Sequence, residues 1–119
     1  MIFGYFDKLK KHLVSNKVYS ELTANTLRLI HEIDPAEISV ALIASKLNMN
    51  ENHIIRTFKK ETSITPHKYI NQMKASLAIK YLQQGMTLET IAEKLGYGSV
   101  SSLSVSFKTA TKKNLSYFK

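Results

Sequence analysis

Apolar residues recur at steps of three and four positions along almost the whole chain. This spacing places apolar side chains on one face of an α-helix and polar side chains on the other. No segment shows the long, strict alternation of apolar and polar residues that is typical of a half-buried strand. We therefore predict an all-α fold. The apolar stripes lie at residues 2–13, 18–33, 42–47, 54–58, 69–82, 88–95 and 103–110.

Residues that start or stop helices separate these stripes. Thr65 followed by Pro66 combines an N-cap with a proline at the first helical position, which is a strong signal for a helix start. Gly85 stands where the long helix that follows should end, and Asp34-Pro35 stops an earlier one. We expect further N-caps at Ser39, Asn50, Thr87 and Ser99.

The sequence contains an internal repeat. Residues 43–49 return at 91–97 with the shared pattern Ile-Ala-x-Lys-Leu, and Phe58-Lys59 returns as Phe107-Lys108 one residue further on. Each copy predicts a short helix, a tight turn at an Asn or Gly, and a longer helix, which is the helix-turn-helix pattern. Two such units joined by a helix at 66–84 would present both second helices on the same side of the molecule.

The charge is unevenly distributed along the 119 residues. The formal net charge is +8, and it falls entirely on residues 40–119, because residues 1–39 carry as many acidic as basic side chains. A basic segment beside a neutral one favours a polyanionic partner, most often nucleic acid. The alternative is a solvated lysine-rich surface with no partner.

The sequence lacks the residues that several classes of function require. Cysteine is absent, which excludes a disulfide framework, a thiolate metal site and a cysteine nucleophile. There is no glycine-rich phosphate loop, no nucleophile-base set and no apolar run long enough to span a membrane. The four histidines are dispersed, so we expect no metal site, no cofactor and no enzymatic activity. They are His12, His31, His53 and His67.

The residues of the repeat resemble the DNA-binding domain of AraC/XylS-type transcription regulators. The resemblance rests on Ile-Ala and Phe-Lys in both copies, on Gly96-Tyr97, and on Thr65-Pro66 between the copies. It implies two helix-turn-helix subdomains that insert their second helices into adjacent major-groove segments on one face of DNA. The implied organisation is an extra N-terminal amphipathic helix at 1–17, a first subdomain at 18–64, a linker helix at 65–85 and a second subdomain at 86–119.

The resemblance also implies a role. It points to a bacterial, cytoplasmic regulator that binds double-stranded DNA in the nucleoid and contacts RNA polymerase as an activator, with repression by occlusion left open. Both the short stand-alone members and the C-terminal part of a larger regulator fit the pattern. We expect a monomer on DNA, although the helix at 2–14 could pack on the domain, form a dimer contact or be the remainder of a linker. The alternative from another class is a helical adaptor module whose basic face binds an acidic protein.

The second helix of the first copy carries a stripe suited to base recognition. Asn52, Ile55, Arg56 and Lys59 follow one another at helical spacing, on the face opposite the apolar stripe. Arginine can bond guanine O6 and N7 together, and asparagine can bond adenine N6 and N7 in the same way. Ile55 could contact a thymine methyl group. We expect Lys59 and Lys60 to contact phosphates.

The second copy departs from this pattern. Its equivalent stripe holds two serines and a valine, whereas members of the family commonly carry Arg or a large polar residue at the place of the valine. Serine bonds many base edges and phosphates equally well, so we expect weak base discrimination here. The candidate DNA-binding residues of this copy are Ser99, Ser101, Ser104, Val105, Lys108 and Lys112.

Overall fold

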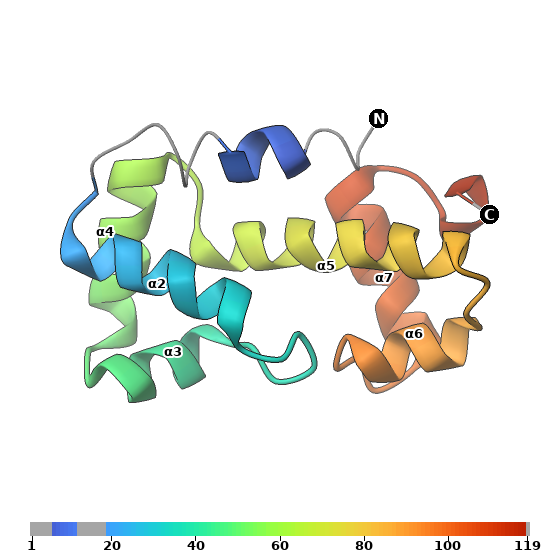
Figure 1. Ribbon diagram of the computed structural model, residues 1–119, viewed down its shortest axis with the longest axis horizontal. Helices are drawn as coiled ribbons and strands as arrows, with labels where there is room; N and C mark the ends of the chain where they lie inside the picture. Colours follow the sequence, from blue (N-terminus) through green and yellow to red (C-terminus); the bar gives the residue numbers. More distant parts are fainter. Residues whose placement is uncertain (1–5, 12–18, 119) are drawn as a thin grey trace.

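The computed structural model describes residues 6–11 and 19–118, and all regular structure in these ranges is helical, as predicted (Figure 1). Residues 6–11 are helical and precede α2 in the sequence. The other helices are α2 (Glu21–Glu32), α3 (Val40–Leu47), α4 (Glu51–Thr62), α5 (Pro66–Gln83), α6 (Leu88–Lys94), α7 (Val100–Thr111) and a short 3-10 helix, η1 (Leu115–Phe118).

The expected caps are confirmed. Each side chain predicted as an N-cap accepts a hydrogen bond from a backbone amide of the first turn, at 2.8–3.2 Å. Pro66 is the first residue of α5, and Gly85 follows the end of that helix with φ 85°. One cap was not predicted: Ser20 begins α2, and its hydroxyl accepts from the amide of Thr23. The caps are Ser39, Asn50, Thr65, Thr87 and Ser99.

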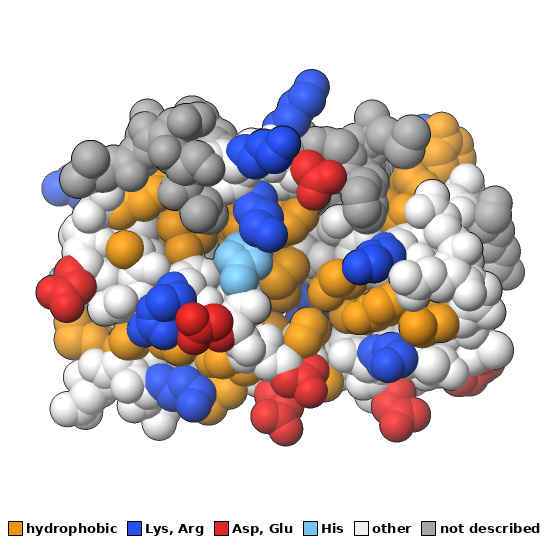
Figure 2. Space-filling model, in the orientation of Figure 1, with side chains coloured by type: hydrophobic (Ala, Val, Ile, Leu, Met, Phe, Trp, Pro, Cys, Tyr) orange, Lys and Arg blue, Asp and Glu red, His pale blue; other side chains and the backbone are white. Residues whose placement is uncertain are grey.

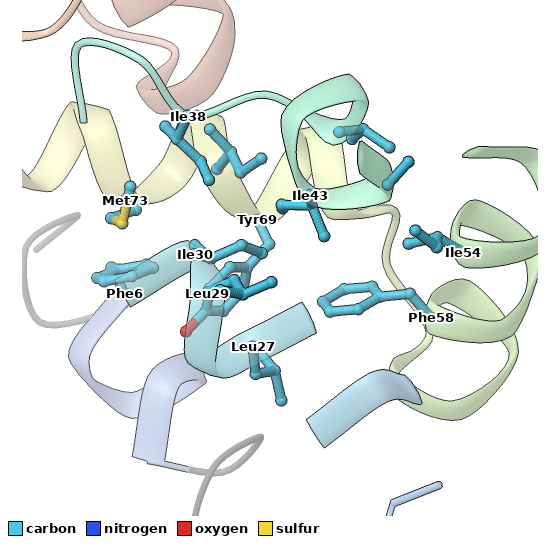
Figure 3. Close-up of a cluster of buried hydrophobic side chains, with 13 residues drawn as sticks. Phe6, Leu27, Leu29, Ile30, Ile38, Ile43, Ile54, Phe58, Tyr69 and Met73 are labelled. Carbon is cyan, nitrogen blue, oxygen red and sulfur yellow. The ribbon is translucent and has the colours of Figure 1, made fainter. Parts of the chain in front are cut away.

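The long helix α5 runs along the longest axis of the molecule and contributes to two separate hydrophobic cores (Figure 1). Its first half buries Tyr69 and Met73 against α2, α3 and α4, in the cluster drawn in Figure 3. Its second half buries Ile79 against α6 and α7. Phe58 and Phe107 are the buried equivalents of the two copies, with 0% and 2% of their surface exposed. The repeat therefore exists in the fold as two similar helical units on one shared helix.

The similarity extends past the end of each second helix. Thr62 and Thr111 are buried, and each hydroxyl bonds a carbonyl four residues earlier, that of Phe58 at 2.7 Å and that of Phe107 at 2.9 Å. Each hydroxyl also accepts from the amide two residues later. These threonines stop both helices in the same way, although the apolar pattern of the sequence does not single them out.

Two contacts among the described residues help to fix the placement of the units, one made by a side chain of α5 and one made directly between the units. The side-chain amide of Gln72 on α5 donates to the carbonyl of Ala110 at the end of α7, at 2.9 Å. At the turn before α7, Gly96 lies directly against the backbone of Ala36 in the loop between α2 and α3. A Cβ atom on Gly96 would overlap the Ala36 carbonyl and lie 2.9 Å from its Cα. The relative placement of the two units therefore depends on a residue without a side chain.

The described part of the N-terminal helix packs on the first unit. Phe6 is 5% exposed, and its ring lies 5.5 Å from the ring of Tyr69 (Figure 3). The Tyr69 hydroxyl in turn lies 2.6 Å from Nε2 of His31 on α2. Burial, and then the charge of Lys10, lower the pKa of His31 below its ordinary value. Three roles were considered for this helix; Phe6 and Leu9 pack on the first core, and residues 1–5 and 12–17 lie outside the described ranges.

Candidate nucleic-acid interface

Both helix-turn-helix units have the expected turn. Asn48 ends α3 with φ 54°, and Gly96 follows α6 with φ 80°, so both residues adopt the left-handed conformation that the sequence predicted. In Figure 1, α4 and α7 both rise from the bottom to the top of the view, α4 beside the start of α5 and α7 across its second half. The two second helices therefore run in roughly the same direction.

The outward face of α4 exposes four of the five residues predicted for DNA on this helix. Ile54 and Phe58 fill the core, with 1% and 0% of their surface exposed. Asn52 and Arg56 are exposed on the other side of the helix, together with the following Lys59 and Lys60. The fifth predicted residue, Ile55, is half-buried and packs against the first hydrophobic cluster. Its side chain is therefore shared between the core and the surface, which the sequence pattern did not reveal.

A hydrogen-bonded contact with α2 positions α4. The hydroxyl of Ser20 donates to one carboxylate oxygen of Glu61 at 2.7 Å, and the Ser20 amide donates to the other at 2.8 Å. Burial alone would raise the pKa of Glu61, but these hydrogen bonds outweigh it and hold the pKa below its ordinary value. This contact joins the start of α2 to the end of α4, and so limits how α4 can tilt.

The outward face of α7 has a different composition. Leu103 and Phe107 point into the second core, while Ser101 and Val105 are exposed. Ser104 is half-buried. Two of the candidate DNA-binding residues, Lys108 and Lys112, are exposed, and Lys112 takes the left-handed position after the helix with φ 65°. The hydroxyl of the sixth residue, Ser99, accepts the capping hydrogen bond of α7.

Tyr97 packs at the edge of the second hydrophobic core and reaches the surface. It is half-buried beside α7, and its hydroxyl lies 3.0 Å from Oγ of Ser106. The ammonium group of Lys74 on α5 lies 5.2 Å from the centre of its ring. Together with Ser101 and Val105, Tyr97 lines a shallow hollow on the outward side of α7. The spacing of apolar residues in the sequence does not indicate this hollow, because it depends on how Tyr97 and α7 pack in three dimensions.

The basic side chains of α4 and α7 are not neutralised by carboxylates. Among the described residues, the one ion pair joins Arg28 to Glu32 within α2, at 2.9 Å. Figure 2 shows acidic and basic side chains mixed on the face that contains α2 and α5. That face is therefore not a uniformly basic surface. The charge of Arg56 and of the neighbouring lysines remains available to a polyanion.

Other kinds of site find no support in the described ranges. No three His, Cys, Asp or Glu side chains of residues 6–11 and 19–118 come together as metal ligands. None of the helices in these ranges combines the length and the apolar character needed to cross a membrane. The exposed stripes of α4 and α7 are therefore the strongest candidates for a functional surface.

Comparison with known proteins identifies the family. A helix-turn-helix domain family model matches residues 43–119, which run from within α3 to the end of the chain and include α4, α5, α6 and α7. The chain is 35% identical over 89 residues to a putative AraC-like transcription regulator of Streptomyces lividans, covering 73% of this chain and 29% of that protein. It is 31% identical over 91 residues to the uncharacterised helix-turn-helix-type transcriptional regulator YtdP of Bacillus subtilis (strain 168), covering 76% of this chain and 12% of that protein. The similarity thus spans less than a third of either relative.

Solved structures show the same fold. The C-terminal domain of AraT, a response regulator from Geobacillus stearothermophilus, superposes with a TM-score of 0.78 at 19% identity, covering 86% of each chain. The C-terminal domain of the two-component response regulator yesN from Fusobacterium nucleatum gives 0.74 at 20% identity, covering 83% of this chain and 98% of that one. This chain belongs to the AraC-type helix-turn-helix family of transcription regulators and contains the DNA-binding domain of that family.

Proposed function

We propose that the chain regulates transcription by inserting α4 and α7 into successive major-groove segments on one face of double-stranded DNA. The observation that carries this proposal is the pair of similarly directed second helices, each with a buried inner face and an exposed outer face that includes cationic side chains. The major groove of B-DNA is wide enough to admit an α-helix. One chain with two such helices can occupy two groove segments without a dimer partner.

The two helices have different roles in this proposal. On α4, the exposed Arg56 and Asn52 have the bidentate side chains that distinguish guanine and adenine, and each well-placed pair is worth about 1–3 kcal/mol of discrimination. On α7, the exposed Ser101 and the half-buried Ser104 form hydrogen bonds that many base edges satisfy. The site should therefore contain two blocks about 10–10.5 base pairs apart, the first sharply specified and the second specified less sharply by hydrogen bonds.

In this proposal, lysines contact the phosphates and so orient the protein on the duplex. Lys59, Lys60, Lys108 and Lys112 are exposed at the ends of α4 and α7, where the backbone of the duplex would pass on either side of the groove. Each true phosphate contact releases about one counterion, so its loss lowers the slope of log affinity against log salt by roughly one. Contact with RNA polymerase and a monomeric state on DNA also belong to this proposal.

The experiment compares Arg56→Ala with Lys59→Gln on a duplex selected from random DNA by the whole chain. Arg56→Ala should weaken binding to the selected duplex by about 1–3 kcal/mol, and should leave binding to unrelated duplexes nearly unchanged. Lys59→Gln should weaken binding to all duplexes alike and reduce the salt slope by roughly one. An equal loss on all sequences for Arg56→Ala would show that Arg56 contacts a phosphate and does not recognise a base.

The same titrations separate the proposal from the adaptor alternative. A helical module that binds an acidic protein does not require a groove-sized footprint or a preference among duplexes. If Gln at each of the four lysines left the salt slope unchanged, the basic excess would be a solvated surface. The adaptor alternative would then be the better explanation of the charge.

A further inference from the structure

We propose that α7 recognises the C5-methyl group of a pyrimidine in the second block, by contact with Val105. In ordinary DNA this group belongs to thymine, and in methylated DNA it also belongs to 5-methylcytosine. The inference rests on the proposed function of α7 as a helix that enters the major groove. It adds an apolar contact to a helix whose serine hydroxyls distinguish poorly between bases.

The exposure of Val105 is the first observation. Its side chain is 69% exposed, although the neighbouring Leu103 and Phe107 are 1% and 2% exposed and supply the apolar contacts of α7 with the second core. Val105 therefore adds little to folding. It stands one helical turn after Ser101, in the middle of the outward face that α7 would present to the groove.

The second observation is the hollow beside it. Val105 lines a shallow depression with Tyr97, Ser101, Ser102 and Ser106, so the floor combines a branched aliphatic group, an aromatic ring and small side chains. No carboxylate or ammonium group lines it. A methyl group can therefore enter the depression without removing water from a charged side chain.

The ring that forms one wall of the hollow is held from two sides. The Tyr97 hydroxyl lies 3.0 Å from Oγ of Ser106, and the Lys74 ammonium lies 5.2 Å from the ring centre. Burial raises the pKa of Tyr97, and the hydrogen bond with Ser106 opposes that rise, so the phenol stays protonated near neutral pH. Because these contacts exist without DNA, the hollow is organised before a base arrives, and little ordering is needed on binding.

The chemistry of the major groove supplies the occupant. Each A·T pair presents a methyl group there, and this group is the one apolar feature that distinguishes thymine from the other three bases. Hydroxyls of Ser101 and Ser102 can bond several base edges, whereas an aliphatic contact is improved only where a methyl group is present. The second block should thus tolerate many changes but favour a methylated pyrimidine at one position.

The experiment removes single methyl groups from the DNA. Each thymine of the second block in the selected duplex is replaced in turn by deoxyuridine, which keeps the base pair and lacks only the methyl group. One replacement should weaken binding by roughly fourfold, the factor expected for burying one methyl group. At that position, exchanging T·A for C·G should also weaken binding, and 5-methylcytosine in place of cytosine should recover a similar factor.

Variants at position 105 assign the effect to this side chain. In Val105→Ala the deoxyuridine effect at that position should fall to nearly nothing, while Val105→Ile should retain it, because isoleucine keeps the branched aliphatic contact. Both changes are at an exposed site, so neither should alter the folded structure. The two perturbations form a double-mutant cycle whose coupling isolates the contact of Val105 with the methyl group.

The outcomes separate this inference from the proposed function. If Lys108→Gln weakens binding but no deoxyuridine in the second block does, α7 contacts DNA and the methyl inference is wrong. A deoxyuridine effect that persists unchanged in Val105→Ala would also overturn it. If neither Lys108→Gln nor any base change in the second block affects binding, the proposed insertion of α7 fails as well.

Discussion

Replacement of Gly96 by alanine should destabilise the protein much more than the same replacement at Gly85. Both glycines have left-handed backbones, with φ 80° and φ 85°, so an alanine at either site is strained. The left-handed conformation costs an L-residue about 1–2 kcal/mol, and the reduced freedom of the unfolded chain offsets about 0.4–1 kcal/mol of this. A methyl group added at Gly85 would meet no other atom within 4 Å. Gly85→Ala should therefore cost about 1 kcal/mol.

At Gly96 a steric penalty is added. The new methyl group would overlap the Ala36 carbonyl oxygen and lie 2.8 Å from its carbon, and these are backbone atoms that cannot rotate away. Overpacking of this kind typically costs about 1–3 kcal/mol. The total for Gly96→Ala should therefore be about 2–4 kcal/mol.

Urea unfolding followed by helical circular dichroism measures both variants directly. Gly85→Ala is the matched control, because it shares the residue types and the backbone conformation and lacks the neighbour. A larger loss at Gly96 measures the contact between the two helix-turn-helix units. If the two variants lost the same stability, the loop at Ala36 would yield freely, and Gly96 would not hold the units in register.

Three further predictions concern stability. Phe58→Ala and Phe107→Ala should each cost about 3–5 kcal/mol in urea unfolding, because both rings are fully packed; a near-neutral result at either would contradict its burial. Ser63→Gly should stabilise the protein by about 1 kcal/mol, since Ser63 has φ 72°, and a higher urea midpoint would show it. The folded state lowers the pKa of His31, so it binds this proton less readily than the unfolded chain, and stability should fall as the pH drops below about 6.5. His31→Gln should make that decline shallower, and an unchanged decline would mean that other groups cause it.

The helices were predictable because their signals are local. A cap such as Thr65 and a proline at position 66 determine where α5 begins from adjacent residues alone. The two helix-turn-helix units were predictable from the repeat, which aligns Phe58 with Phe107 within the sequence itself. The same repeat contained the matching Thr62 and Thr111, but a threonine at a helix end shows its buried hydrogen bonds only in three dimensions.

The sequence predicted which residues share the outward faces of α4 and α7, but it predicted their exposure less well. Periodicity assigns a residue to a face, and it cannot tell how far a neighbouring helix covers the edge of that face. Ile55 and Ser104 lie at such edges and are half-buried, while Tyr97 extends from an apolar face to the surface. The contact of Gly96 with Ala36 joins residues far apart in the chain, so no local pattern indicates it.

The length of α5 has a consequence for the DNA that the protein can fit. Met73 belongs to the first core and Ala75 to the second, so one added residue between them would turn the second unit by about 100° and move it by about 1.5 Å. Two added turns would nearly restore the rotation, and would move the units apart by about 10.5 Å, close to the rise of three base pairs. The number of residues in α5 therefore sets the distance and the rotation between the two units. Relatives with a longer or shorter α5 should require a different separation between their two DNA blocks.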